Sequence, residues 1–367
     1  MLFRFYKYMR LGENKMKRRG KLLLGLSLAG IMALNLTGCG SSEPNKQVYV
    51  YNWGDYIDPE VNEMFEEETG IKVVYQEYSD NEVLFTSVES ETVNYDVIFP
   101  SDYMIEKMIN NDMLQKLDFS KIPNYANIDE RFKNLPYDPN NEYSVPYMWG
   151  TMGIVYNKTM VDDPVDSWDI LWNEKYKDKI FMYDSERDSI MVALKKLGYS
   201  MNTRDANELE AAKQELIKQS PLVLGYVSDE GKTKMINNEA ALMVAWAGDA
   251  MVMMAQNPDL EYVIPKEGSN FFVDGICITK NAENVEAAYK YIDFLCRPEI
   301  AAMNAEYIGY STPISAAREM LPEEIKNSEV AYPDENVTGA DKMEMFNDPS
   351  DVASTYSSIW TKVKASN

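Results

Sequence analysis

The sequence contains no histidine and only three cysteines among its 367 residues. The lack of histidine excludes Ser-His-Asp and Cys-His nucleophile systems, and it excludes zinc or haem sites that need a histidine ligand. Three scattered cysteines cannot build a four-cysteine metal site or a disulfide-rich scaffold. We therefore expect a protein that binds rather than catalyses, without a metal or another cofactor.

Positive charge is also scarce, because 36 Lys and Arg residues face 59 Asp and Glu residues and give a net charge of −23. Such a chain is repelled by phosphate backbones, so no nucleic-acid partner is expected. An acidic protein suits a cationic ligand, although excess acid more often serves solubility. The length favours two domains, and a hydrophobic content of 45% is sufficient for packed cores.

The N-terminus has the features of a targeting segment. Residues 1–21 carry eight basic residues and one acidic residue, and an apolar run follows over residues 22–36. This run has the length of a signal-peptide core and is short for a stable membrane anchor. It ends in Leu36-Thr37-Gly38-Cys39, which resembles the lipobox of bacterial lipoproteins. The resemblance implies that Cys39 is lipidated and becomes the first mature residue.

We therefore expect a lipoprotein signal peptide over residues 1–38 and a linker over residues 39–46. Removal of the basic leader lowers the net charge from −23 to −30. Residues 16–21 form a complete basic region by themselves, so residues 1–15 are interpreted as an over-extended gene model.

The first part of the mature chain alternates between strand and helix patterns. Strands are predicted at 47–53, 71–78 and 95–101, with a helix after Asp58-Pro59 and another over 81–91. The strands begin 24 residues apart, which indicates a βαβαβ unit with a parallel sheet. Ligands of such sheets lie beyond the carboxyl ends of the strands, where residues 53–56 and 101–103 fall.

The remaining chain predicts a second α/β domain. An apolar stretch over 143–157 is interpreted as an extended crossover into it. Further strands are expected at 179–184, 222–228, 240–246, 262–265 and 272–279, and helices at 207–219, 284–296 and 351–364.

Aromatic residues stand beside carboxylates at several predicted loop positions. Aromatic faces attract ammonium groups by roughly 0.5–2 kcal/mol, and a nearby carboxylate adds a charge-assisted hydrogen bond. Together they favour binding of an organic cation, but sugar binding uses the same residue types. A third interpretation is that these are core aromatics and solvated acids without a binding role. The groups are Trp53/Asp55/Tyr56, Ser101/Asp102/Tyr103, Asp184/Asp188, Trp246/Asp249 and Phe272/Asp274, with Tyr310 nearby.

Six motifs follow one another along the mature chain: Tyr51-Asn52-Trp53-Gly54-Asp55-Tyr56, Glu68-Thr69-Gly70-Ile71-Lys72-Val73, Tyr95-Asp96-Val97-Ile98-Phe99-Pro100-Ser101, Val145-Pro146-Tyr147-Met148-Trp149-Gly150, Pro265-Lys266-Glu267-Gly268 and Ile308-Gly309-Tyr310-Ser311-Thr312-Pro313. These motifs closely resemble those of the spermidine/putrescine-binding proteins of bacterial polyamine ABC transporters. The resemblance runs from about residue 47 to the C-terminus, and the motifs keep their order and spacing.

This resemblance implies a type II periplasmic-binding-protein fold, in which two α/β lobes with mixed sheets are joined by a two-segment hinge. The lobes would comprise 47–150 with 273–320, and 151–272 with 321–367. The resemblance also implies a monomer that captures putrescine or spermidine outside the cytoplasm, either lipid-anchored to the outer face of the cell membrane through Cys39 or periplasmic. It then delivers the ligand to ABC permease subunits.

The ligand site implied by the resemblance combines aromatic walls with two acids. Asp274 would be the central anchor and Asp188 a second ammonium-binding acid, in different lobes. The other positions carried over are Trp53, Tyr56, Ser101, Tyr103, Ser185, Trp246, Phe272 and Tyr310.

Three positions depart from the pattern of spermidine-binding proteins. Ser185 stands where Asp is usual, Phe272 where Trp is usual, and Phe346 where a Gln aligns. Two matched acids suit the dication putrescine, whereas a third acid could restore a partner for spermidine, so the preference between the two ligands stays open. The candidates for this third acid are Asp184, Glu186 and Asp249.

Two other functions remain open at this point. The first is a sugar- or iron-binding lipoprotein of the same fold, and the second is a glycoside hydrolase that uses two carboxylates. For Cys277 and Cys296 we expect buried free thiols, and for Trp149 packing at the hinge.

Overall fold

A computed structural model describes residues 46–339 and 342–366. The expected signal peptide, Cys39 and the expected linker up to residue 45 lie outside the described residues. Within the described residues, no helix is both long and apolar enough to cross a membrane.

The strands form one sheet in the order β2-β1-β3-β9-β4-β7-β5-β6, with β8 paired to β4. β1 is parallel to β2 and β3, as the regular strand spacing predicts, and β9 is antiparallel to β3. The strands are β1 (Gln47–Trp53), β2 (Lys72–Tyr78), β3 (Val97–Ile98), β4 (Ser144–Asn157), β5 (Ile180–Tyr183), β6 (Val223–Val227), β7 (Leu242–Trp246), β8 (Leu260–Val263) and β9 (Phe271–Ile278).

Local sequence signals explain the first strand-helix-strand unit. The Asp58 side chain accepts a hydrogen bond from the N–H of Glu60 and caps α2 (Pro59–Thr69), whose first position is a proline. The helix ends at Gly70, which has a φ of 68°, a conformation that glycine adopts without strain. β2 then begins at Lys72, beside β1.

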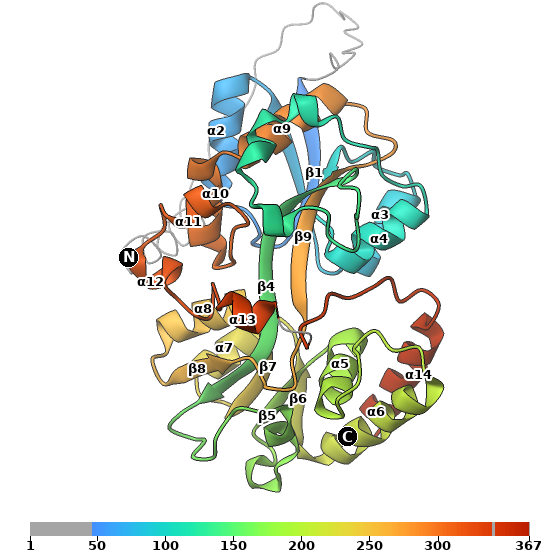
Figure 1. Ribbon diagram of the computed structural model, residues 1–367, viewed down its shortest axis with the longest axis vertical. Helices are drawn as coiled ribbons and strands as arrows, with labels where there is room; N and C mark the ends of the chain where they lie inside the picture. The colour runs from blue at the N-terminus through green and yellow to red at the C-terminus, as the bar shows by residue number, and fades with distance from the viewer. Residues whose placement is uncertain (1–45, 340–341, 367) are drawn as a thin grey trace, which may run out of the picture. The chain divides into compact units, whose positions relative to one another are not determined.

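Strands β4 and β9 connect two groups of strands, and they run side by side through the middle of Figure 1. Residues 144–151 of β4 pair with β9, whereas residues 152–157 pair with β7 and β8. The stretch predicted to be extended at 143–157 is thus one long strand that pairs with both groups. Trp149 lies in this segment and is completely buried.

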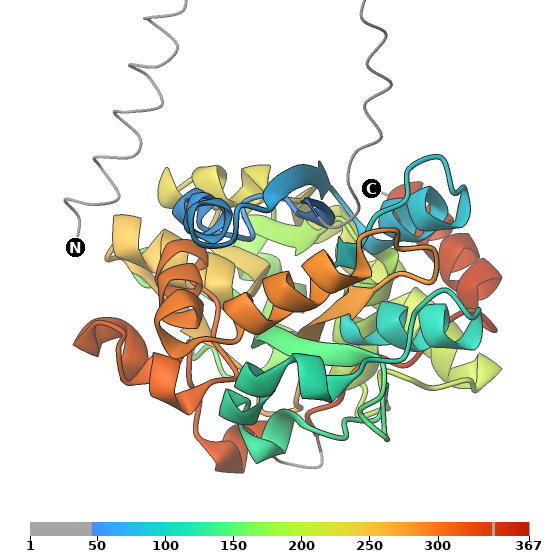
Figure 2. The ribbon, with the colours of Figure 1, turned by 90° about the horizontal axis from the view of Figure 1, so that it is seen from above.

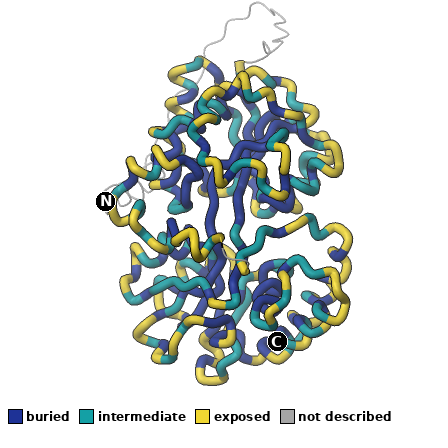
Figure 3. Tube along the Cα trace, viewed as in Figure 1, coloured by how far each residue is buried: buried dark blue, intermediate teal, exposed yellow. Residues whose placement is uncertain are grey.

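Helices lie on both faces of the strands (Figure 2), and the buried residues follow the strands while the exposed ones gather in the outer turns (Figure 3). The 3₁₀ helices are η1 (Phe119–Lys121), η2 (Pro123–Asn127), η3 (Glu130–Phe132), η4 (Trp168–Trp172), η5 (Glu174–Tyr176) and η6 (Ser220–Leu222). The α-helices after α2 are α3 (Asn81–Glu89), α4 (Asp102–Asn110), α5 (Glu186–Lys196), α6 (Ala206–Gln219), α7 (Glu230–Ile236), α8 (Ala247–Gln256), α9 (Val285–Leu295), α10 (Pro298–Ile308), α11 (Ser315–Arg318), α12 (Glu323–Lys326), α13 (Glu335–Thr338) and α14 (Ala353–Lys364).

Two predicted strands differ from the observed ones. The strand expected at 95–101 is reduced to Val97–Ile98, and Pro100, which has no N–H to donate, lies beyond its end. The strand expected at 262–265 begins and ends two residues earlier, before Pro265. Cys277 and Cys296 are buried free thiols, as the sequence predicts.

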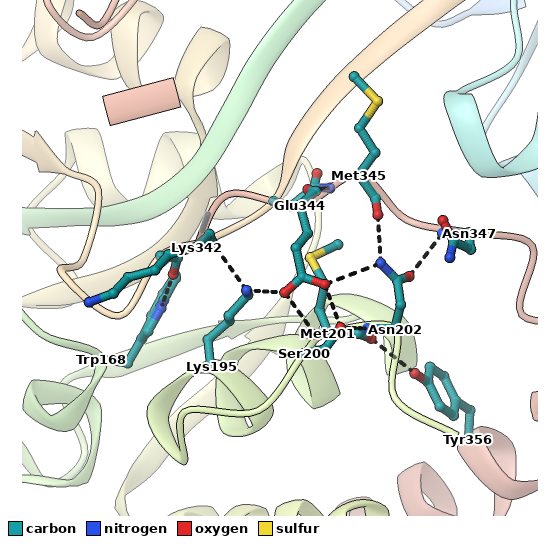
Figure 4. Close-up of polar contacts among 12 residues, drawn as sticks. Trp168, Lys195, Ser200, Met201, Asn202, Lys342, Glu344, Met345, Asn347 and Tyr356 are labelled. Atoms are coloured by element: carbon teal, nitrogen blue, oxygen red, sulfur yellow. Dashed lines mark hydrogen bonds and ion pairs between the residues drawn. The ribbon is translucent and has the colours of Figure 1, made fainter. Parts of the chain in front are cut away.

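The C-terminal segment contacts α5 and the turn after it through a cluster of polar contacts (Figure 4). The ammonium of Lys195 is bonded to the carboxylate of Glu344 and, at 2.8 Å, to the carbonyl oxygen of Lys342. The amide of Asn202 donates to the carbonyl of Met345 at 2.7 Å. Only 4% of the Lys195 side chain is exposed, whereas 22% of the Glu344 side chain is, so the ion pair joins a buried ammonium to a partly exposed carboxylate.

Candidate functional site

Most of the predicted site residues lie where a strand runs directly into a helix. Ser101 stands between β3 and α4, Ser185 between β5 and α5, and Trp246 between β7 and α8. β5 and β7 are parallel neighbours, as β1 and β3 are in the first group of strands. These side chains are therefore located at the carboxyl ends of parallel strands, where α/β proteins place their ligands.

Asp274 of β9 is the centre of the first group of site residues. The hydroxyl of Tyr56 donates to its Oδ2 at 2.5 Å, and Ser101 forms a β-bridge with it. Asp274 is only 5% exposed, and its Oδ1 has no hydrogen-bond partner among the described residues. Burial raises the pKa of Asp274 to about 6, although the hydroxyls of Tyr56 and Ser101 lower it.

A row of aromatic rings leads away from this carboxylate. The rings meet edge to face, a geometry that leaves ring faces available to a ligand. The distances between ring centroids are 5.7 Å for Tyr56–Tyr310, 5.9 Å for Tyr310–Phe272, 5.0 Å for Phe272–Trp246 and 6.3 Å for Trp246–Tyr183. Tyr183 was not predicted, although its place at the end of β5 could have indicated it.

The position of Tyr310 depends on a glycine in α8. A Cβ atom added at Gly248 would lie 2.3 Å from a carbon of the Tyr310 ring, which is far inside van der Waals contact. Tyr310 itself follows Gly309, which ends α10 with a φ of 86°. The absence of a side chain at Gly248 therefore lets the ring rest directly on the first turn of α8.

A second group of site residues surrounds Asp188 of α5. The Ser185 hydroxyl caps the helix by accepting a hydrogen bond from the N–H of Asp188 at 3.3 Å. Asp188 is 1% exposed, and its Oδ1 has no partner among the described residues. Burial raises the pKa of Asp188, while the guanidinium of Arg187, 3.7 Å from Oδ2, lowers it.

Arg187 was not predicted as part of the site. Its guanidinium carbon lies 3.9 Å from the ring centroid of Tyr103 and 5.0 Å from that of Phe346. Both distances are within the range of cation–π contact. In the sequence Arg187 is flanked by Glu186 and Asp188, so it looks like part of a charged helix surface, and only the structure shows its contact with Tyr103 of α4.

Asp102 is a further carboxyl that the predicted site did not include. It is 1% exposed, its Oδ1 accepts the N–H of Tyr103 at 2.7 Å, and its Oδ2 has no partner among the described residues. The pKa of Asp102 is raised to about 8, mainly by burial. The N–H of Tyr103 and the guanidinium of Arg187 lower this pKa, whereas the nearby Asp274 raises it. The pKa of Asp102 therefore depends on charged residues of both groups.

Trp53 contacts Tyr78 and Phe99, which belong to neither group of site residues. Its ring packs on Tyr78 at 4.7 Å, and its indole N–H donates to the carbonyl of Phe99 at 2.9 Å. The hydroxyl of Tyr78 donates to the same carbonyl at 2.6 Å. The indole is therefore held in a fixed orientation at the last residue of β1.

The three acids considered as a third ammonium partner have partners elsewhere. Asp184 accepts from Lys364 at 2.8 Å, and Glu186 accepts from Ser357 at 3.3 Å. Asp249 forms an ion pair with Lys232 at 3.1 Å. Unlike Asp274, none of these three acids has a buried carboxylate oxygen without a hydrogen-bond partner among the described residues.

Comparisons with known proteins agree with this architecture. Residues 60–332 match the family described as bacterial extracellular solute-binding protein. The chain is 40% identical over 352 residues to the spermidine/putrescine-binding periplasmic protein of Salmonella typhimurium, covering 95% of this chain and 99% of the relative. It is 36% identical over 370 residues to a putrescine-binding periplasmic protein of Pseudomonas aeruginosa, with the same coverages.

Comparison with a solved structure identifies the same family and its fold. The spermidine/putrescine ABC transporter substrate-binding protein of Streptococcus pneumoniae has a TM-score of 0.79 and 42% identity, covering 87% of this chain and 99% of that one. The expected type II periplasmic-binding-protein fold and the expected family are confirmed. The chain therefore belongs to the bacterial extracellular solute-binding proteins and, within them, to the family of the spermidine/putrescine-binding proteins.

Proposed function

We propose that this protein captures polyamines, putrescine or spermidine, outside the cytoplasm and delivers them to an ABC importer. The observation that carries the proposal is Asp274, a buried carboxylate with one unpartnered oxygen at the start of an aromatic row. An unpaired buried carboxylate is costly, and a ligand ammonium would supply the missing charge and hydrogen bond. The names of the relatives point to the same ligands.

The aromatic row suits the carbon chain of a polyamine. Methylene groups between the amines can lie against the rings of Tyr310, Phe272 and Trp246, while ring faces attract the ammonium ends. A sugar would need several hydrogen-bonding groups around its ring hydroxyls, whereas Phe272 supplies none. Among the described residues, no group of three or more Cys, Asp and Glu side chains could hold a metal ion.

In the proposed mechanism the ligand bridges the two lobes. We assign 47–150 and 273–320 to one lobe and 151–272 and 321–367 to the other, so that Asp274 and Asp188 belong to different lobes. The change of β4 partners after residue 151 supports this division. A diamine held by both acids stabilises the closed form because it binds that form better than the open one.

The predicted signal peptide and lipobox support a further proposal about where the protein acts. Cleavage after residue 38 and lipidation of Cys39 would anchor the protein to the outer face of the cell membrane, where a monomer could supply permease subunits. The test is metabolic labelling with a radioactive fatty acid in a bacterial host that processes lipoproteins. The full chain should be labelled and Cys39→Ala should not, whereas equal labelling of both would refute the assignment of Cys39.

A thermal-shift panel tests the choice of ligand. Putrescine or spermidine should raise the melting temperature of the mature protein, because a ligand that binds only the folded state stabilises it. Maltose and ferric citrate should leave the melting temperature unchanged. A shift with maltose or ferric citrate and none with either polyamine would overturn the proposal.

A further inference from the structure

Residues 344–351 form a segment, called the strap from here on, that leads from the middle of the molecule to α14 (Figure 1). The strap begins beside the start of β9. The N–H of Phe271 donates to the carbonyl of Glu344 at 2.8 Å, and the N–H of Glu344 donates to that of Ser269 at 3.1 Å. Because β9 is one of the two strands that connect the groups of strands, the strap starts at the junction of the two proposed lobes.

The strap is fixed to the connection between α5 and α6. The amide oxygen of Asn202 accepts the N–H of Asn347 at 2.9 Å. The guanidinium of Arg204 donates to the carbonyl of Asp348 at 2.8 Å and to the carboxylate of Asp351 at 2.9 Å. Asn202 and Arg204 both lie in this connection, which belongs to the same proposed lobe as the strap itself. We therefore expect the strap to move together with α5 and α6.

Two contacts reach from the strap across to α4, which belongs to the other proposed lobe. The N–H of Asp348 donates to Oε2 of Glu106 at 2.6 Å. The ring of Phe346 meets that of Tyr103 edge to face, with 6.5 Å between the ring centroids. A hydrogen bond from an N–H to a carboxylate is charge-assisted and about twice as strong as a neutral one. Asp348 thus bonds to α4 through its N–H and to the α5–α6 connection through its carbonyl.

The contacts on α4 lie close to the ligand site. Tyr103 is one of the predicted site residues, and Glu106 follows it by three residues, so both lie on one face of α4. Opening of the cleft would move α4 away from the strap and break both contacts. Because the contacts are made in the closed arrangement, they stabilise it relative to an open one. The bond to Glu106 is partly buried, so water competes with it less than at an exposed position.

We propose that the strap stabilises the closed form and that the bond from Asp348 to Glu106 is the contact that slows release of the ligand. The inference rests on the proposed function, because closure around a ligand is part of that proposal. A contact that forms only after closure lowers the dissociation rate and leaves the association rate nearly unchanged. Glu106 is thus a positioning residue that acts on the ligand through the closed arrangement of the lobes.

The direct test compares Glu106→Ala with the wild-type protein in stopped-flow experiments with putrescine and spermidine. Tryptophan fluorescence should report binding, since Trp246 lies in the aromatic row. Loss of a charge-assisted bond should raise the dissociation rate about fivefold or more, while the association rate changes by less than about twofold. Glu63→Ala removes an exposed glutamate of α2 as a matched control and should change neither rate. An unchanged dissociation rate in Glu106→Ala would overturn the inference.

A second variant loosens the strap on its other side and does not depend on folding of the first. Arg204→Met removes the bonds to Asp348 and Asp351 and should also raise the dissociation rate. In the double variant with Glu106→Ala, the two increases should combine to less than their product, because both act through the strap. A wild-type dissociation rate in Arg204→Met, or a full product in the double variant, would contradict the role of the strap. Failure of both polyamines to bind the wild-type protein would instead refute the proposed function, and this inference with it.

Discussion

Acid should weaken polyamine binding through Asp274. In the ligand-free protein the pKa of this carboxyl is about 6, because burial raises it from 3.8. An ammonium ligand needs the ionised form, so binding must release the proton below that pH. The affinity should therefore be nearly constant above pH 7 and fall by about tenfold for each pH unit below pH 6. Protonation of Asp188, whose pKa is also raised, would steepen the fall.

The assay is calorimetry of putrescine binding between pH 5 and pH 8. At pH 6 about half of the Asp274 carboxyls carry a proton, so binding should release roughly 0.5 proton per site. This number is obtained from the dependence of the measured enthalpy on the ionisation enthalpy of the buffer. Polyamine ammonium groups stay charged throughout this range, so they do not contribute to the release.

A variant that removes the hydrogen bond from Tyr56 to Asp274 provides the control. The Tyr56 hydroxyl lowers the pKa of Asp274, so Tyr56→Phe should raise that pKa above 6 and move the midpoint of the affinity profile to higher pH. The ring itself remains, and so do its contacts with Tyr310. An affinity that is equal at pH 5 and pH 7.5, with no proton release at pH 6, would refute the role of Asp274.

Other residues give further predictions. The folded-state pKa of Asp102, about 8, exceeds its unfolded value of 3.8, so its ionisation disfavours the folded state. In denaturation experiments Asp102→Asn should therefore stabilise the protein increasingly from pH 4 to pH 8, and equal stability at all pH values would contradict this. Glu344→Gln leaves the buried Lys195 without its counter-charge and should lower the free energy of unfolding by about 3 kcal/mol, while the double variant with Lys195→Met should recover part of the loss. Gly248→Ala should displace the Tyr310 ring and weaken polyamine binding by about threefold or more, with little effect on the far-UV circular dichroism.

Local patterns in the sequence were sufficient to predict the first βαβαβ unit, whereas the type II periplasmic-binding-protein fold was implied by the family resemblance. The helix signals at Asp58-Pro59 and Gly70, the alternation of elements and the 24-residue spacing all correspond to observed features. The short 3₁₀ helices between 119 and 132 were not foreseen, because three- to five-residue turns have no hydrophobic period. β3 is shorter than expected because Pro100 cannot donate a hydrogen bond.

The site was predictable to a smaller extent. The residues that follow strands, such as Ser101 and Trp246, could be identified from position and residue type. Arg187 could not, because a basic residue between two acids in a helix is typical of a solvated surface. Asp102 was visible as an acid, but the burial that raises its pKa depends on the packing of α4 against β9, which no local pattern reveals.

The most direct test of the account is calorimetry of putrescine and spermidine binding to Asp274→Asn at pH 7.5. Asparagine keeps the shape of the side chain and its hydrogen bond to Tyr56, but it removes the charge that attracts an ammonium group. Asp184→Asn is the control, since Asp184 pairs with Lys364. We predict that Asp274→Asn lowers the affinity for the preferred polyamine at least tenfold, by about 1.4 kcal/mol or more, while Asp184→Asn does not. Unchanged affinity in Asp274→Asn would contradict the account.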